Sequence, residues 1–282
     1  MKSLALALTA MAVLATTAFA APARQIIGGE QDHSLAEVGD CEHFYKTTFT
    51  SFPSQVSDRE QTDLPLAGVE QLRVNATPEG GISIRGWNKP NARLIVCRTA
   101  AALTRPQALR VLGAIRVSHL NGEITATGYP NDDTQAWWVN MILYVPRRAA
   151  VDVHALNGGV AIRNMAGRIT AHATSGGISV AQSSGRYKLS TESGGITLDR
   201  ISGEIEAISR EGTIALKIPH AGLPTIEAKT ADGGHILCTF KDCESGLGVW
   251  APDRKTLRIN GSLAHIRLST IGAPILIGPA TY

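Results

Sequence analysis

Glycine recurs at every ninth position through the middle of the chain. The seven members of the series are Gly158, Gly167, Gly176, Gly185, Gly194, Gly203 and Gly212. A fixed short period is typical of repeat architectures, in which each unit packs only on its neighbours. Glycine suits corners where φ is positive or where another backbone segment comes close, because it has no Cβ. The spacing therefore predicts short units that each end in a corner.

Apolar residues stand two and four positions after nearly every one of these glycines. The pairs are Val160 and Ile162, Ile169 and Ala171, Ile178 and Val180, Tyr187 and Leu189, Ile196 and Leu198, Ile205 and Ala207, and Ile214 and Leu216. A spacing of two is the period of a β-strand, because successive side chains point to opposite faces. Each unit is therefore expected to be a short strand whose aliphatic side chains face inward.

A second period of 18 residues overlies the first. The segments 157–160, 175–178 and 193–196 each contain a Gly-Gly pair, whereas the units between them begin with a single glycine. Two alternating units mean two strands per coil, with like strands stacked in parallel about 4.8 Å apart. We predict an all-β fold: a parallel β-solenoid of the β-helix or β-roll kind, with two strands per 18-residue coil.

The flanking segments extend this pattern less regularly. Strands are expected at 72–74, 80–87 and 93–97, and again after the clear repeats of 157–218 at 225–228, 236–237, 257–259, 265–268 and 275–277. Residues 106–115 are predicted to form one short capping helix with Thr104 as its N-cap. Residues 246–255 are interpreted as an inserted loop. The solenoid domain is expected to cover residues 66–282.

The N-terminus has the features of an export signal. Lys2 is followed by an apolar run from Leu4 to Leu14 and by Ala18-Phe19-Ala20, a small-x-small cleavage site. We predict a signal peptide over residues 1–20, because the run is shorter than the roughly 20 apolar residues that span a bilayer. No later segment is apolar enough to cross a membrane. The mature protein is therefore expected to be periplasmic or secreted.

Residues 21–65 form an acidic segment, interpreted as a tail or cap. From Pro22 to Glu70, nine acidic residues stand against three basic ones. The rest of the chain has a diffuse basic excess, with no run of like charges and no basic stripe with interleaved aromatic residues. Nucleic acid is therefore not expected as a partner.

The chain has four cysteines, and an exported protein is expected to pair them as disulfides. Three pairings are open. Cys238 and Cys243 are close enough in sequence to staple a strand end to its turn, which leaves Cys41 to join the N-terminal segment to Cys97. A metal site at His235, Cys238 and Cys243 is the alternative, but it lacks a fourth ligand and the usual paired spacing. We expect no metal and no cofactor.

Two outer faces are candidate sites. The first predicted sheet has an outward row of small residues, Ala161, Ser179, Thr197 and Ala215, suited to contact with a partner or a second copy. The second sheet carries a charged group, His172, Arg186, Lys188 and Glu206, where a polysaccharide lyase or hydrolase would place its acids and bases. The simpler interpretation is a solvated face with charges that offset one another across adjacent coils.

Trp137 and Trp138 are adjacent in a predicted strand, so one should face the core and the other outward. An outward tryptophan can stack on a sugar or anchor an interface. The alternative is that the cap buries both.

Residues 81–212 resemble the putative-adhesin family of bacterial exported proteins, a family of unknown function built from β-strand repeats. The matching features are Gly-Ile-Ser-Ile-Arg-Gly-Trp at 81–87, the Trp137-Trp138 pair and Tyr-Val-Pro-Arg-Arg at 144–148. The resemblance implies a β-solenoid at the cell envelope and brings no catalytic residues. We expect a non-enzymatic, adhesin-like surface that contacts an envelope protein or surface glycan. The alternatives are an envelope-polysaccharide enzyme and a self-associating scaffold.

Overall fold

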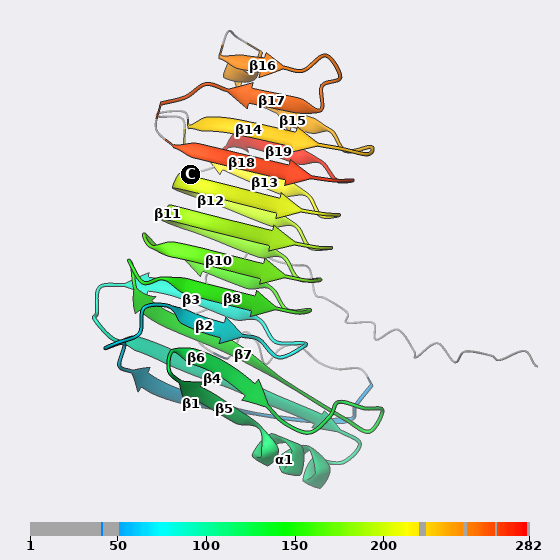
Figure 1. Ribbon diagram of the computed structural model, residues 1–282. Helices are drawn as coiled ribbons and strands as arrows, with labels where there is room; N and C mark the ends of the chain where they lie inside the picture. Colours follow the sequence, from blue (N-terminus) through cyan, green and yellow to red (C-terminus); the bar gives the residue numbers. More distant parts are fainter. Residues whose placement is uncertain (1–40, 42–50, 220–223, 245–246, 263, 281–282) are drawn as a thin grey trace, which may run out of the picture.

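The computed structural model describes residue 41 and residues 51–219, 224–244, 247–262 and 264–280. The predicted signal peptide and most of the acidic segment 21–65 lie outside these residues. The described part is all-β, with a single α-helix at one end of a long stack of strands (Figure 1).

The elements follow one another along the chain in an almost unbroken series of strands. In order they are β1 (Ser54–Leu64), β2 (Leu72–Asn75), β3 (Ile82–Trp87), β4 (Ala92–Ala102), α1 (Arg105–Ala114), β5 (Arg116–Leu120), β6 (Glu123–Thr127), β7 (Gln135–Pro146), β8 (Val151–Ala155), β9 (Val160–Arg163), β10 (Arg168–Ala173), β11 (Ile178–Thr191), β12 (Ile196–Ser209), β13 (Ile214–Ile218), β14 (Thr225–Thr230), β15 (Ile236–Cys238), a 3-10 helix (Lys241–Cys243), β16 (Gly248–Trp250), β17 (Thr256–Ile259), β18 (His265–Thr270) and β19 (Ile275–Pro279).

Two ladders of strands run along the stack. Ladder A contains β6, β2, β8, β10, the second halves of β11 and β12, then β18, β14, β17 and β16. Ladder B contains β7, β3, β9, the first halves of β11 and β12, then β13, β19 and β15. Ile169 pairs with Tyr187 and Ile178 with Ile196, so the register advances by 18 residues per coil, as the repeat predicts.

The predicted inward residues form the core between the two ladders. Every apolar pair predicted after the glycines from Gly158 to Gly212 is buried. In ladder B, the isoleucines at 178, 196, 214 and 275 follow one another across successive strands. Each side chain therefore packs on an equivalent one above and below, and burial of a large aliphatic side chain contributes about 1.5–3 kcal/mol.

The sheet is mixed, which differs from the uniformly parallel arrangement predicted. At the N-terminal end, β4 pairs antiparallel with both β7 and β1, and β5 pairs antiparallel with β6. At the other end, β17 is antiparallel to β14 and β16 to β17. Residues 54–64 are thus a full strand rather than a tail, and the expected loop at 246–255 contains β16. These strands lie outside the nine-residue repeat, so the repeat gave no information about their direction.

The coils do not stack in chain order. β18 lies between β12 and β14, and β19 lies between β13 and β15 (Figure 1). The coil of β18 and β19 is the last in sequence, but in space it lies inside the stack, between two coils that come earlier in the chain. At the other end, β2 lies between β6 and β8 in the same way. The C-terminal strands therefore have a hydrogen-bonded neighbour on both sides, which protects their edges.

Helix α1 lies at the N-terminal end of the stack, as predicted (Figure 1). Thr104 is its N-cap, accepting a hydrogen bond from the Gln107 backbone N–H, and Pro106 lies in its first turn. Its buried residues, Ala108 and Val111, join the main core. Among the described residues, no helix is long and apolar enough to cross a membrane.

The repeat glycines are required mainly by close backbone approach. A Cβ on Gly176 would overlap the carbonyl oxygen of Gly158 in the preceding coil and lie 2.5 Å from its carbonyl carbon. Both obstacles are backbone atoms, which cannot rotate away. At the alternate corners, Gly185 and Gly203 also have positive φ (129° and 109°), which residues with a Cβ rarely adopt.

Replacement of Gly176 by alanine is therefore expected to destabilise the protein by about 3 kcal/mol or more, since a buried overlap displaces two coils. The matched control is Gly177→Ala, where a Cβ would lie 3.2 Å from the Gly195 oxygen and needs only a small adjustment. We expect that control to change the free energy of unfolding by less than about 1 kcal/mol. Urea unfolding of both variants measures the difference, and equal stabilities would contradict this account of the corner.

Tyr187 provides a pH-dependent test of the core. Its hydroxyl donates to the carbonyl oxygens of Ser184 (2.7 Å) and Met165 (3.1 Å), and burial raises its pKa to about 12. An unfolded tyrosine titrates near pH 10. The raised pKa means that the folded state favours the neutral phenol. The contribution of neutral Tyr187 to the free energy of unfolding is therefore fully present below about pH 10 and is lost as pH rises through about 12, a change of roughly 3 kcal/mol. Unfolding free energies between pH 9 and 12 should fall less steeply in Tyr187→Phe; parallel curves would refute the assignment.

Candidate functional site

The predicted row of small residues exists as one line across the outer face of ladder B. Ala161 pairs with Ser179, Ser179 with Thr197, and Thr197 with Ala215. The neighbouring line contains Gly159, Gly177 and Gly195, whose carbonyl oxygens accept hydrogen bonds from the next strand. Small side chains beside glycine make this part of the face flat.

The row extends beyond the predicted residues at both ends. On one side Ser83 pairs with Ala161, and on the other Ala215 pairs with Leu276 and Leu276 with Leu237. Ser83 and Ala161 are each 1% exposed, so Ala161 is removed from the accessible surface. Leu276 and Leu237 are 37% and 52% exposed. The accessible surface therefore runs from Ser179 to two adjacent leucines, which the sequence analysis missed because their strands lie outside the regular repeat.

The two tryptophans do not form a binding surface. Trp137 is 7% exposed and packs in the main core, and its indole N–H donates to the carbonyl oxygen of Tyr129. Trp138 is 2% exposed and packs on the opposite face of the sheet with Phe52 and Ala101. They point to opposite faces as predicted, but each face is covered there. The interpretation that both are buried is the correct one.

The predicted charged group lies on the outer face of ladder A. Lys188 pairs in register with Glu206, and Arg186 with Glu204. The Arg186 Nε atom lies 2.7 Å from a Glu204 carboxylate oxygen, and both side chains are more than half exposed. This hydrogen bond, followed by the charge of Arg186, lowers the pKa of Glu204. Charges on adjacent coils therefore offset one another, as the simpler interpretation predicts.

His172 belongs to a small polar group that the sequence analysis did not identify. Its Nδ1 atom lies 2.9 Å from the Ser190 hydroxyl oxygen on the next coil. On the other side its ring is 6.3 Å from that of His154, whose Nε2 atom lies 3.2 Å from an Asp152 carboxylate oxygen. Register places these residues together, because Asp152 and His154 lie on β8, beside β10. The group lies on an open sheet face.

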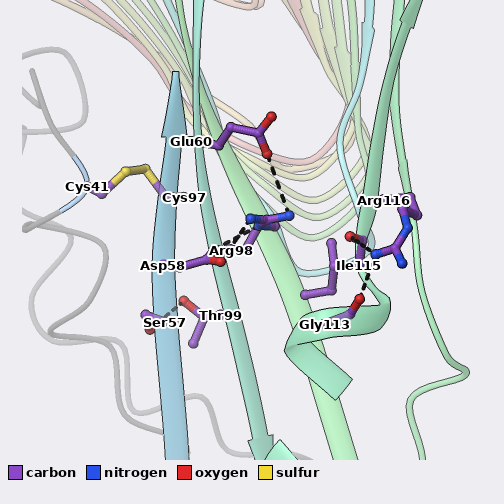
Figure 2. A network of polar contacts seen from close by, with 10 residues as sticks. All are labelled: Cys41, Ser57, Asp58, Glu60, Cys97, Arg98, Thr99, Gly113, Ile115 and Arg116. Carbon is purple, nitrogen blue, oxygen red and sulfur yellow. Dashed lines mark hydrogen bonds and ion pairs between the residues drawn. A yellow bond between two sulfur atoms is a disulfide. The ribbon is translucent and has the colours of Figure 1, made fainter. Parts of the chain in front are cut away.

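A second polar network fastens the N-terminal strands (Figure 2). Arg98 donates two hydrogen bonds to the Asp58 carboxylate, at 2.7 and 2.8 Å, and lies 3.6 Å from Glu60. Arg116 donates to the carbonyl oxygens of Gly113 and Ile115 at the end of α1. These contacts join β1 to β4 and cap the helix, so we assign them a structural role.

The cysteines form two disulfides, Cys41–Cys97 and Cys238–Cys243, which is one of the three pairings that the sequence left open. This pairing excludes the alternative metal site at His235, Cys238 and Cys243. Within the described residues, no group of three or more His, Cys, Asp or Glu side chains is placed to hold a metal ion.

The sequence matches no known protein-family model and no curated protein. Two solved structures are similar. One is a "putative cell adhesion protein" from Clostridium sporogenes ATCC 15579, with 11% identity, a TM-score of 0.41 and coverage of 79% of this chain and 100% of that one. The other is a "putative adhesin" from Bacteroides fragilis NCTC 9343, with 10% identity, a TM-score of 0.38 and coverage of 79% and 97%. Similarity at this level does not assign the chain to a family.

Removing the charge of Arg186 should show how strongly this residue interacts with Glu204 on the next coil. We expect Arg186→Gln to raise the pKa of Glu204 toward its ordinary value, because the carboxylate loses both a donated hydrogen bond and a nearby positive charge. A carboxyl-carbon NMR titration measures the shift. Lys188→Gln is the matched control and should leave the Glu204 titration almost unchanged. An unaltered Glu204 pKa in Arg186→Gln would show that the ion pair does not form in solution.

Proposed function

We propose that this protein is an exported, non-enzymatic β-solenoid that presents a rigid surface at the bacterial cell envelope, in an adhesin-like or protein-interaction role. The single observation that supports this proposal most directly is the outer face of ladder B. There, Ser179, Thr197 and Ala215 form a flat line that continues into the exposed side chains of Leu276 and Leu237. A flat, partly apolar face of this kind suits contact with another macromolecule.

Rigidity is the second argument for a contact surface. Each face residue is held by parallel pairing to the coils on either side, and its inward neighbours are buried aliphatic side chains. The surface therefore loses little conformational freedom on binding, which favours affinity. Export is supported by the N-terminal signal pattern and by the two disulfides, which persist in oxidising compartments. Both the periplasm and the exterior provide such conditions.

The polysaccharide-enzyme alternative receives less support. Arg186 forms an ion pair with Glu204 on the next coil, and His172 forms a hydrogen bond with Ser190. The acidic residue nearest to Lys188 in register is Glu206 on the adjacent strand of the same open face. Glycosidases instead hold two carboxylates on either side of the scissile bond.

The double variant Ser179→Arg/Thr197→Arg tests the proposal. Two long charged side chains would stand above the flat line, so we expect at least a tenfold loss of binding to envelope partners, or dissociation if the partner is a second copy. Pull-down from solubilised envelopes and light scattering are the measurements. If only the molecular mass measured by light scattering changes, the partner of this face is a second copy of the chain.

Thr170→Arg/Ser269→Arg is the matched control, because both residues face outward on ladder A. This control should retain binding, and both variants should keep the native circular dichroism. Unchanged partner binding and unchanged mass in Ser179→Arg/Thr197→Arg would overturn the proposal.

A further inference from the structure

The outward face of helix α1 is basic and apolar at once. The helical period places Arg105, Leu109 and Gly113 along one line, with Pro106 and Arg110 beside it, and all five residues are exposed. Leu109 keeps 50% of its surface exposed although it is a large aliphatic residue. The helix contains no acidic residue. Its outward face therefore has one leucine between two arginines.

Residues at the two ends of the helix continue this surface. Leu103, which precedes the N-cap, is also 50% exposed, and Arg116 follows the helix at an exposed position. The Arg116 guanidinium donates to the carbonyl oxygens of Gly113 and Ile115 at 2.6 and 3.1 Å (Figure 2). Carbonyl groups have no net charge, so these bonds fix the guanidinium in place and leave it positive. Two exposed leucines and three arginines thus lie within residues 103–116.

Ion pairs do not neutralise these arginines. Within the part of the chain that the structure describes, neither Arg105 nor Arg110 forms an ion pair. Asp132 and Asp133 lie in the loop before β7, which is hydrogen-bonded to α1, and Asp132 accepts a 2.7 Å hydrogen bond from the Thr134 backbone N–H. The acidic residues of β1 are used in the ion pairs with β4 described above. Three arginines thus stand against two carboxylates around the helix, which leaves a positive excess.

The position of α1 lets this face meet a broad, flat partner. The helix is at the extreme end of the stack, and no labelled element lies beyond it (Figure 1). A flat surface can therefore contact the helix without first meeting the strands. The stack would then extend away from that surface, with the outer faces of both ladders left free for other contacts.

We propose that this surface, named here the α1 surface and defined by Leu103, Arg105, Leu109, Arg110 and Arg116, binds an anionic lipid membrane. Arginine side chains are attracted by the negative surface potential of anionic lipids. Exposed leucines enter the boundary between the headgroups and the acyl chains. A soluble acidic protein or polysaccharide would attract the arginines but offers no apolar layer for the leucines, so the combination favours a membrane. This contact is additional to the partner contact proposed for ladder B.

Co-sedimentation of the disulfide-bonded protein with lipid vesicles tests the proposal. The protein is prepared without the predicted signal peptide 1–20, because that apolar run would itself enter a bilayer. Vesicles of phosphatidylglycerol and phosphatidylcholine in equal parts are compared with vesicles of phosphatidylcholine alone. We expect saturable binding to the anionic vesicles that weakens with added salt, and little binding to the neutral ones. Equal binding to both kinds of vesicle, or binding to neither, would overturn the proposal.

A pair of charge variants locates the contact. Arg105→Gln/Arg110→Gln should weaken binding to anionic vesicles about tenfold or more, because two attracted charges are lost. The matched control, Arg168→Gln/Lys229→Gln, removes two charges from exposed positions of ladder A and should lose less than about twofold. All four side chains are exposed, so both variants should keep the native circular dichroism. Equal losses in the two variants would overturn the assignment to α1.

Leu109 distinguishes a membrane from a soluble polyanion. Leu109→Gln keeps every charge and should weaken vesicle binding about fivefold, because the apolar contact is lost. Retention on dextran sulfate should not change in this variant. In Leu109→Trp, brominated phosphatidylglycerol should quench the added indole beyond the quenching seen in the unaltered protein. Unchanged vesicle binding in Leu109→Gln, or no added quenching in Leu109→Trp, would overturn the proposal.

The α1 surface and the small-residue row fail separately. Ser179→Arg/Thr197→Arg should retain vesicle binding, and Arg105→Gln/Arg110→Gln should retain the partner contact of the proposed function.

Discussion

Close approach of one backbone to the next at the glycine corners is the constraint on which the structure depends. The carbonyl oxygen of Gly158 occupies the space that a Cβ on Gly176 would need, and the same relation recurs at Gly194 and Gly212. Only with these corners can the 18-residue register place isoleucine on isoleucine through ladder B. One coil buries too few aliphatic side chains to offset its loss of backbone entropy, so stability depends on the stack.

The same stacking determines the chemistry of the outer faces. Each outward residue has a fixed neighbour on the next coil, so residues at equivalent positions of successive coils form a line of side chains that crosses several strands. In ladder A, oppositely charged residues lie beside each other on adjacent coils, as Arg186 and Glu204 do. Ladder B has small residues at Ser179 and Thr197, exposed leucines toward one end, and cations with aromatic rings toward the other. The two ladders thus present chemically different surfaces.

Sequence reasoning was strongest where the repeat is regular. It predicted the buried pairs from Val160 to Leu216, the helix after Thr104 and the line from Ala161 to Ala215. It left three disulfide pairings open, one of which is the observed one. It was weaker wherever two segments meet without a periodic signal. Periodicity indicates that one of Trp137 and Trp138 faces outward, but it cannot show that Phe52 packs against Trp138. Similarly, Arg85, Arg93 and Arg163 are unremarkable along the chain and become a cluster only through the pairing of β3, β4, β7 and β9.

The sequence by itself determined the period, the strand faces and the need for many stacked coils, because these follow from local spacing of glycine and aliphatic residues. Only the tertiary structure decided the order of the coils. Strands β18 and β19 insert between earlier coils, and β4 crosses antiparallel beside β7. Any coil with isoleucine or leucine inside packs almost equally well on any other such coil. The local pattern therefore cannot specify which coil lies next to which.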